Sequence, residues 1–311
     1  MIADPQQNYW WGVALELKLR KSSGDAFQEF FSVLMGKLHG SDFIRVRAFG
    51  KLGDKGCDGY LKSSGQVFAC YGALNGDGGK VKYLITKMAS DYAKAHKALS
   101  SIMNEWHMVH NLVEGLPAEA ILQLDILQKA NLQKEFGFVG LEGFQQRIFG
   151  LPQAEIEELL GVVASARDAE ELQFSDLREL ITNISAAADE IEFDVTTIEP
   201  VPPEKLTFNN LPGHWRALIA GGWQNAHLVE SYLDKHSDPL MGARVAQTFR
   251  NKYSYLKRQN ISAGAIMSAL YDMIAGVAGV TAQRQVATQA ILAHLFESCD
   301  IFEGQPQGVE A

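Results

Sequence analysis

A glycine-rich turn with two aspartates is the part of this chain best suited to chemistry. Residues 53–60 read Gly-Asp-Lys-Gly-Cys-Asp-Gly-Tyr, and an apolar run at residues 66–71 follows them. Glycine lets the backbone turn sharply and lets a bulky ligand come close. A carboxylate beside such a turn is well placed to hold a divalent metal ion near that ligand. We therefore expect Asp58 to be a catalytic metal ligand, and Asp54 to be a turn former or an orienting group.

The apolar run predicts a strand that would complete such a site. Metal-dependent cleavage of a phosphodiester needs a metal, a means of deprotonating water, and charge relief at the scissile phosphate. One layout places an acid or glutamine on this strand and a lysine two residues later, because residues i and i+2 point to the same face. Ala69 and Tyr71 stand at these two catalytic positions. The main-chain carbonyl of Cys70, between them, offers a further metal ligand.

Neither register of this strand supplies the expected lysine. Alanine has no ligand atom, and a tyrosine with a pKa of about 10 is a poor base at neutral pH. The alternative register uses Gln66 but puts Phe68 at the lysine position. The lysine would then come from elsewhere, from Lys55, Lys80 or Lys87.

Glu29 is the expected second carboxylate of the site, both as a catalytic residue and as a metal ligand. It lies on a predicted helix at residues 26–38, off the apolar stripe that repeats at three and four residues. Glu16 is a weaker alternative. His107 and His110 are expected in the core, and Cys57 and Cys70 are expected as small buried thiols. The chain has no Walker, GxGxxG or GxSxG motif.

The charge is divided unevenly along the chain. Residues 1–100 carry 14 Lys and Arg against 9 Asp and Glu, whereas residues 101–311 carry 14 against 28. The first third is thus net basic and suited to a polyanion, and the acidic remainder is better suited to a protein partner. We expect double-stranded DNA to be held by lysines around the turn, namely Lys51, Lys55, Lys80 and Lys82.

The predicted elements indicate an α/β domain followed by an all-helical one. Strands are predicted at residues 42–49, 66–71, 106–113 and 136–140, with helices at 81–99, 117–131 and 141–149 between and after them. Strands separated by helices imply some parallel pairing, in a mixed sheet flanked by helices. Beyond residue 161 the pattern is helical, with a proline-rich linker at residues 199–203. We expect domains at residues 1–161 and 162–311.

The composition is that of a soluble globular protein, with 47% hydrophobic and 21% charged residues. No apolar run reaches the length of a membrane span, and the first residues do not have the pattern of a secretory signal. Three cysteines without a paired metal-ligand spacing are typical of a reducing compartment. We therefore expect a cytoplasmic protein that does not contact a membrane.

The segment from residue 43 to residue 72 resembles a known family. It is similar to the restriction-endonuclease-like, PD-(D/E)xK-type nuclease domain of bacterial three-component ABC-ATPase defence systems, which are related to Lamassu. Their Gly-Asp-x-Gly-x-Asp-Gly turn is matched at residues 53–59, and the Tyr of the following Gln-x-Tyr-like motif is matched by Tyr71, while Ala69 stands where Gln is expected. The similarity extends over the helix with Lys87 and the strand at 106–113. It continues into the helical domain at residues 209–211, 250–253 and 295–303.

This resemblance implies an effector that cuts or grips DNA for anti-phage or anti-plasmid defence. It implies Mg²⁺ or another divalent cation as cofactor, and a homo-oligomer as the active form. The implied partners are an SMC/Rad50-like ABC ATPase and a small third subunit. Because Ala69 departs from the motif, a metal-dependent DNA endonuclease and a non-catalytic DNA-binding or scaffold subunit that kept the nuclease fold both remain open. A pure protein adaptor, in which the basic excess of the first third is incidental, is a third and weaker alternative.

Overall fold

The computed structural model describes residues 5–48, 53–76, 81–186, 208–276, 280–298 and 301–302. The chain divides into two compact units. The sheet unit is Ala14–Gly161, and the helical unit joins Met1–Val13 to Val162–Ala311. The first helix, α1 (Pro5–Lys21), therefore begins in the helical unit and ends in the sheet unit.

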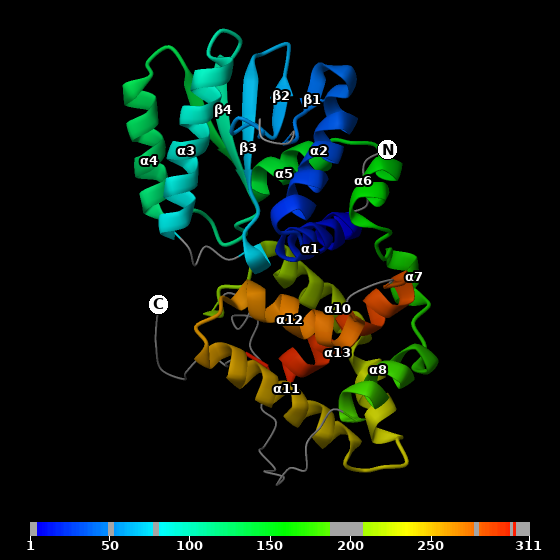
Figure 1. The fold of residues 1–311 in the computed structure, drawn as a ribbon. Coiled ribbons are helices and arrows are strands. Elements are labelled where there is room, and N and C mark those ends of the chain that lie inside the picture. Colours follow the sequence, from blue (N-terminus) through cyan, green and yellow to red (C-terminus); the bar gives the residue numbers. More distant parts are fainter. Residues whose placement is uncertain are drawn as a thin grey trace. The chain divides into compact units, whose positions relative to one another are not determined.

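A five-stranded mixed sheet forms the centre of the sheet unit (Figure 1). Its strands follow chain order: β1 (Phe43–Arg45), β2 (Gly59–Leu61), β3 (Gln66–Tyr71), β4 (Glu105–His110) and β5 (Glu135–Val139). β1, β2 and β3 pair antiparallel, whereas β3, β4 and β5 pair parallel. The expected mixed α/β architecture is confirmed. β2 was not predicted, and the first strand, predicted at residues 42–49, ends at Arg45, with residue 49 outside the described residues.

Helices cover both faces of this sheet. The remaining elements of the unit are α2 (Gly24–His39), η1 (Gly40–Asp42), η3 (Leu74–Gly76), α3 (Val81–Leu99), α4 (Ala118–Ala130), α5 (Leu141–Ile148) and α6 (Gln153–Leu160). Figure 1 shows α3 and α4 side by side on one face, and these two helices contact each other. α2 and α5 pack on the other face, because Phe31 of α2 meets both Phe68 of β3 and Phe144 of α5. The central strand β3 is thus buried on both faces.

Side chains alternate along β3, so the strand contributes to the apolar core on each face of the sheet. Val67, Ala69 and Tyr71 lie in a hydrophobic cluster with side chains of α3 and α4. Phe68 points the other way, with its ring 5.3 Å from that of Phe31. A strand with period-two side chains and two covered faces reads as a continuous apolar run, which is what residues 66–71 show.

The helix α2 carries the apolar stripe predicted for it. Its buried side chains are Phe27, Phe30, Phe31, Ser32, Leu34 and Met35. The helix begins at Gly24 with Ser23 at the N-cap and no side-chain cap bond, and Asp25 lies in its first turn. Negative charge in the first turn still favours the helix through the macrodipole.

The helical unit is built around one nearly buried helix. Its elements are α7 (Ala166–Glu170), α8 (Phe174–Ala186), α10 (Gly213–Asp234), α11 (Met241–Arg258), α12 (Ala263–Ala275) and α13 (Ala282–Glu297). α13 is buried over most of its length, and its buried side chains include Gln285, Thr288 and Gln289 beside apolar ones. At Gly222 of α10 an added Cβ would lie 2.7 Å from the Gln289 carbonyl oxygen, so glycine lets α10 and α13 approach closely. No helix among the described residues is long and apolar enough to cross a membrane.

Candidate functional site

The glycine-rich turn folds through left-handed backbone conformations. Gly53, Lys55 and Gly56 have φ values of 64°, 60° and 71°. The Asp54 carboxylate accepts a hydrogen bond of 2.8 Å from the Gly56 amide, which makes Asp54 the turn former that the sequence predicts. A Cβ on Gly56 would lie 2.3 Å from the carbonyl oxygen of Asp91, so this turn packs directly against the backbone of α3. The turn therefore requires glycine at position 56 for both conformation and space.

Asp58, at the end of this turn, is held between two strands by its main chain. Its amide donates to the carbonyl of Phe68 at 2.7 Å, and its carbonyl accepts from the amide of Val46 at 3.0 Å. Its carboxylate Oδ2 accepts a 2.6 Å hydrogen bond from the amide of Cys70. Among the residues that the structure describes, none donates a hydrogen bond to Oδ1 of Asp58. One carboxylate oxygen is thus fixed in direction and the other remains available.

The environment of Asp58 disfavours its charged form. The residue is 7% exposed. Burial raises its pKa to about 6, although the Cys70 amide and the positive charge of Lys87 act to lower it. The nearby charges of Asp54 and Asp91 raise this pKa further. A buried carboxylate with few compensating partners is typical of a functional site.

Lys87 on α3 is the cation that acts on Asp58. Its ammonium donates to Oδ2 of Asp91 at 2.5 Å, and Lys94 reaches Oδ1 of Asp91 at 3.3 Å. Burial works to lower the pKa of Lys87, but the hydrogen bond and charge of Asp91, together with the charge of Asp58, raise it. Lys87 is therefore a partly buried, charged lysine on the helix against which the turn packs.

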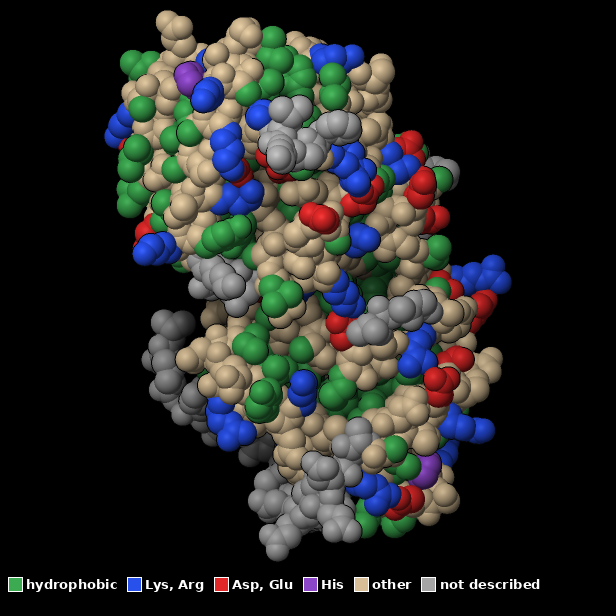
Figure 2. All heavy atoms as spheres, in the orientation of Figure 1, with side chains coloured by type: hydrophobic (Ala, Val, Ile, Leu, Met, Phe, Trp, Pro, Cys, Tyr) green, Lys and Arg blue, Asp and Glu red, His purple; other side chains and the backbone are tan. Residues whose placement is uncertain are grey.

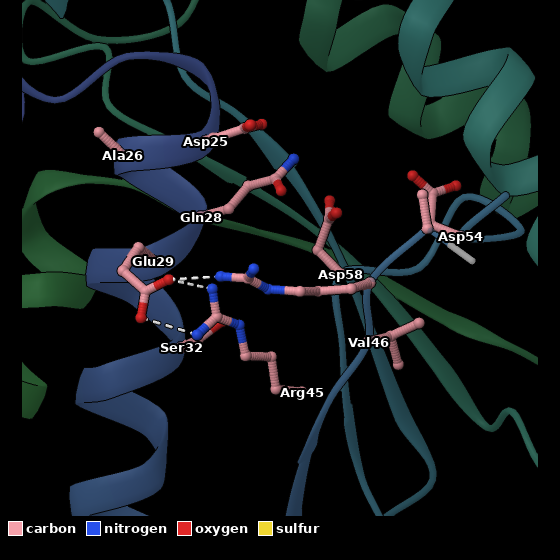
Figure 3. A pocket seen from close by; sticks show the side chains of 11 residues that line it. Asp25, Ala26, Gln28, Glu29, Ser32, Arg45, Val46, Asp54 and Asp58 are labelled. Carbon is pink, nitrogen blue, oxygen red and sulfur yellow. Dashed lines mark hydrogen bonds and ion pairs between the residues drawn. The ribbon is translucent and has the colours of Figure 1, made fainter. Parts of the chain in front are cut away.

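The turn, α2 and β1 enclose a cavity of about 510 Å³. Figure 3 shows the carboxylates of Asp54 and Asp58 turned in the same direction, with Gln28 of α2 also lining the pocket. The lining residues come from three segments: Asp25, Ala26, Gln28, Glu29, Ser32, Arg45, Val46, Arg47, Ala48, Asp54 and Asp58. Acidic and basic side chains thus share one concave surface.

Glu29 lines this cavity but is engaged by two arginines. Its Oε1 accepts from Arg45 Nη1 at 2.7 Å and its Oε2 accepts from Arg47 Nη2 at 2.7 Å. Oε2 also accepts from Nη2 of Arg45, so the Arg45 pair is bidentate. The hydrogen bond from Arg45, with the charges of both arginines, lowers the pKa of Glu29. The structure therefore brings Glu29 into the pocket of Asp58, where its carboxylate pairs with two arginines, and its expected role as a metal ligand stays a prediction.

The strand positions predicted as catalytic lie in the core. Ala69 is fully buried and Tyr71 is 6% exposed, both in the cluster that faces α3. The Tyr71 ring lies 6.1 Å from the ring of Tyr83. At Cys70 it is the amide that meets Asp58, whereas the sequence suggested its carbonyl as a ligand. Burial raises the pKa of the Cys70 thiol well above its usual value, so this side chain is a neutral core group.

The structure describes two of the four lysines expected to hold DNA. Lys55 in the turn and Lys82 on α3 are both exposed. Figure 2 shows Lys and Arg side chains over α3, with carboxylates between them. Lys51 and Lys80 lie outside the described residues.

The two arginines of the pocket were not among the predicted site residues. Arg45 and Arg47 are two residues apart, so the period-two rule applied to residues 42–49 could have placed them on one face. Their partner Glu29 could not be assigned in this way, because a helix-to-strand pair depends on how α2 packs on the sheet. Among the described residues no group of three or more His, Cys, Asp or Glu side chains could hold a metal ion.

The C-terminal part of the chain is similar to a known family of domains. No curated protein and no solved structure matches the chain. Residues 175–303, which run from α8 through α13, match the family model for C-terminal domain 10 of the ABC-three component (ABC-3C) systems.

Proposed function

We propose that this chain is an effector subunit of an ABC-three component type defence complex, and that its sheet unit hydrolyses phosphodiester bonds in double-stranded DNA. The match of residues 175–303 to a C-terminal domain of such systems supports the first part. The second part rests on Asp58. We take the helical unit to serve assembly with an SMC/Rad50-like ABC ATPase and a small third subunit.

The observation that carries the proposal is the environment of Asp58. Its carboxylate is buried, it has one oxygen fixed by the Cys70 amide, and it lines a cavity that also holds Arg45 and Arg47. A buried carboxylate gains most from a cation placed against it, because the cation offsets the loss of hydration. Guanidinium groups on the same cavity suit the phosphates of a nucleic acid backbone.

The residues of the pocket fit a magnesium ion better than a metal held entirely by protein ligands. Mg²⁺ keeps several waters and is commonly bound through one or two carboxylates together with substrate phosphates. Asp58 would hold it, with Asp54 on the same side of the pocket as a second carboxylate through water. Such an ion supplies Lewis-acid polarisation of the phosphate and a bound water of lowered pKa.

Lys87 is proposed to take the part of the lysine that β3 lacks. Its charge acts on Asp58, it is partly buried, and Asp91 orients it through a 2.5 Å hydrogen bond. A fixed ammonium beside the metal carboxylate would stabilise negative charge that develops on the attacking water or on the phosphate. The exposed lysines Lys55 and Lys82 would hold DNA on either side through phosphate contacts.

The test is DNA cleavage by the purified full-length chain with Mg²⁺, comparing the parent with Asp58→Asn. We expect metal-dependent nicking or cutting by the parent and a loss of about 100-fold or more in the variant. Asparagine keeps the shape and can still accept from the Cys70 amide, and a thermal melt of both proteins checks folding. Equal cleavage by the parent and by Asp58→Asn would show that the site is elsewhere.

The second candidate is a DNA-binding or scaffold subunit without catalysis. The burial of Ala69 in the core favours it, because no side chain of β3 reaches a metal from that position. This reading predicts salt-sensitive DNA binding by the parent without cleavage under any divalent cation, also when the partner subunits are present. Cleavage of both strands would instead need two copies of the site, for which we propose a homo-oligomer.

A further inference from the structure

Arg45 and Arg47 converge on Glu29 in the pocket that Asp58 also lines. Arg45 ends β1, and Arg47 follows two residues later, beyond the end of the strand. Both reach across to one carboxylate on α2, and Oε2 of Glu29 accepts from both guanidinium groups. Figure 3 shows this convergence, with the dashed bonds meeting at Glu29. Two cations thus share a single anion.

A guanidinium fork binds a carboxylate and a phosphate through the same parallel N–H···O bonds. A carboxylate carries one negative charge on two oxygens, and a phosphodiester also presents one charge on two free oxygens. Glu29 therefore occupies the arginines in the manner of a backbone phosphate. We propose that Arg45 and Arg47 are a binding site for a phosphate of the DNA backbone, and that Glu29 fills this site in cis until DNA displaces it.

The exposure of the three side chains makes displacement feasible. The side chains of Arg45, Arg47 and Glu29 are 32%, 69% and 46% exposed. Ion pairs at such positions are screened by water and salt and contribute little to stability. The carboxylate can therefore swing into solvent at low cost, and its α2 backbone need not move.

Displacement of Glu29 from the arginines would change the charge that the pocket presents to DNA. Among its described lining residues are two arginines and four carboxylates, those of Asp25, Glu29, Asp54 and Asp58. With Glu29 in place, one of the two positive charges is offset, and the remaining carboxylates repel a polyanion. Release of Glu29 exposes two guanidinium groups on the cavity that contains Asp58. A phosphate held there would bring the DNA strand to Asp58, a step that rests on the proposed nuclease function.

The test is binding of a fluorescent DNA duplex to the full-length chain without divalent metal, measured by anisotropy over a salt series. We expect Glu29→Gln to tighten binding by about three- to ten-fold and to steepen the salt slope by about one. Arg47→Gln should weaken binding and reduce the slope by about one. In the double variant Glu29→Gln with Arg47→Gln, most of the gain should disappear. Glu119→Gln is the matched control, because it makes the same charge change on exposed Glu119 of α4 and should leave binding unchanged.

Three results would overturn the assignment. One is unchanged or weaker DNA binding by Glu29→Gln, with Glu29→Ala agreeing and both variants folded. Another is an equal gain in Glu119→Gln, which would make the effect one of net charge. A third is that Glu29→Gln binds inorganic phosphate more tightly than the parent, as measured by thermal shift, but does not bind DNA more tightly. Because these measurements need no metal, they separate this claim from catalysis: loss of cleavage in Asp58→Asn with no effect of Glu29→Gln supports the nuclease alone.

Discussion

The turn that ends at Asp58 and the strand β3 are joined by the hydrogen bond from the Cys70 amide to the Asp58 carboxylate, but they are built for different purposes. The turn holds a buried carboxylate, left-handed residues and a glycine pressed on α3, all of which cost stability. On the sheet face that α3 and α4 cover, β3 presents only apolar or aromatic side chains, Ala69 and Tyr71 among them. Strain and buried charge retained beside an optimised core are typical of functional sites. We therefore place the chemistry in the turn, and we take β3 to hold the turn in position.

The largest expected effect is on the turn itself, through Gly56→Ala. The added methyl would meet the Asp91 carbonyl at 2.3 Å and would sit on a residue with φ of 71°. We expect a loss of about 4 kcal/mol in the free energy of unfolding. Gly53→Ala is the matched control, because Gly53 has a similar φ of 64° but no atom of the described residues within 4 Å of an added Cβ. It should cost only about 1 kcal/mol in urea unfolding. Equal losses would mean that contact with α3 does not position the turn.

The second prediction concerns the pH dependence that buried Asp58 imposes. Its folded-state pKa of about 6 lies above the value of about 3.9 for an unfolded chain, so the folded state binds the proton more tightly. Stability should therefore fall as pH rises from about 4 to about 6, by roughly 3 kcal/mol from this group. Asp58→Asn should remove this part of the dependence and be more stable than the parent at neutral pH. If the free energy of unfolding changed with pH in the same way in both proteins across this range, the raised pKa of Asp58 would be contradicted.

The third prediction tests the strand. Ala69→Gln would add the side chain found in the nuclease motif that residues 43–72 resemble, but into a cluster of buried residues. We expect a loss of about 2 kcal/mol from overpacking and from burying an amide. Ala89→Gln on the exposed side of α3 makes the same change and should stay within about 0.5 kcal/mol of the parent. A stable Ala69→Gln protein that gains magnesium-dependent cleavage would show that β3 carries chemistry after all.

The smallest effect is expected from Lys87→Gln. Removal of the ammonium takes away a charge that lowers the pKa of Asp58, so this pKa should rise further. Asp91 keeps Lys94 as a partner at 3.3 Å, so the stability loss should be about 1 kcal/mol. Lys82→Gln, at an exposed position of the same helix, is the control and should leave the pH profile unchanged. If the free energy of unfolding depended on pH in the same way in Lys87→Gln and in the parent, Lys87 would have no effect on the pKa of Asp58.

Local patterns predicted the elements that have a strong period. The strand at residues 66–71 and the helix at residues 81–99 have the predicted bounds, because one is a long apolar run and the other a long amphipathic one. β2 was missed because it has three residues and begins with glycine, so that its pairing partners decide its conformation. α7 was missed for a similar reason, because its five residues are too few for periodicity to identify it.

The site shows the same division between local and long-range information. Asp54 as a turn former follows from its own sequence neighbours, and its bond to the Gly56 amide has that form. The pairing of Glu29 with two arginines depends on the register between α2 and β1, which no local pattern encodes. The position of Lys87 near Asp58 depends likewise on the contact of Gly56 with α3. Side chains that converge from three elements therefore became visible only in the fold.

The most direct test of the central claim is divalent metal binding at Asp58, measured by calorimetry with Mn²⁺ or Mg²⁺ at about pH 5 and about pH 7. If Asp58 is the metal carboxylate, protons compete for it, and the parent should bind about ten-fold more weakly at the lower pH. Asp58→Asn should bind weakly at both pH values, without this dependence. Equal affinity of the parent and Asp58→Asn at both pH values would contradict the account.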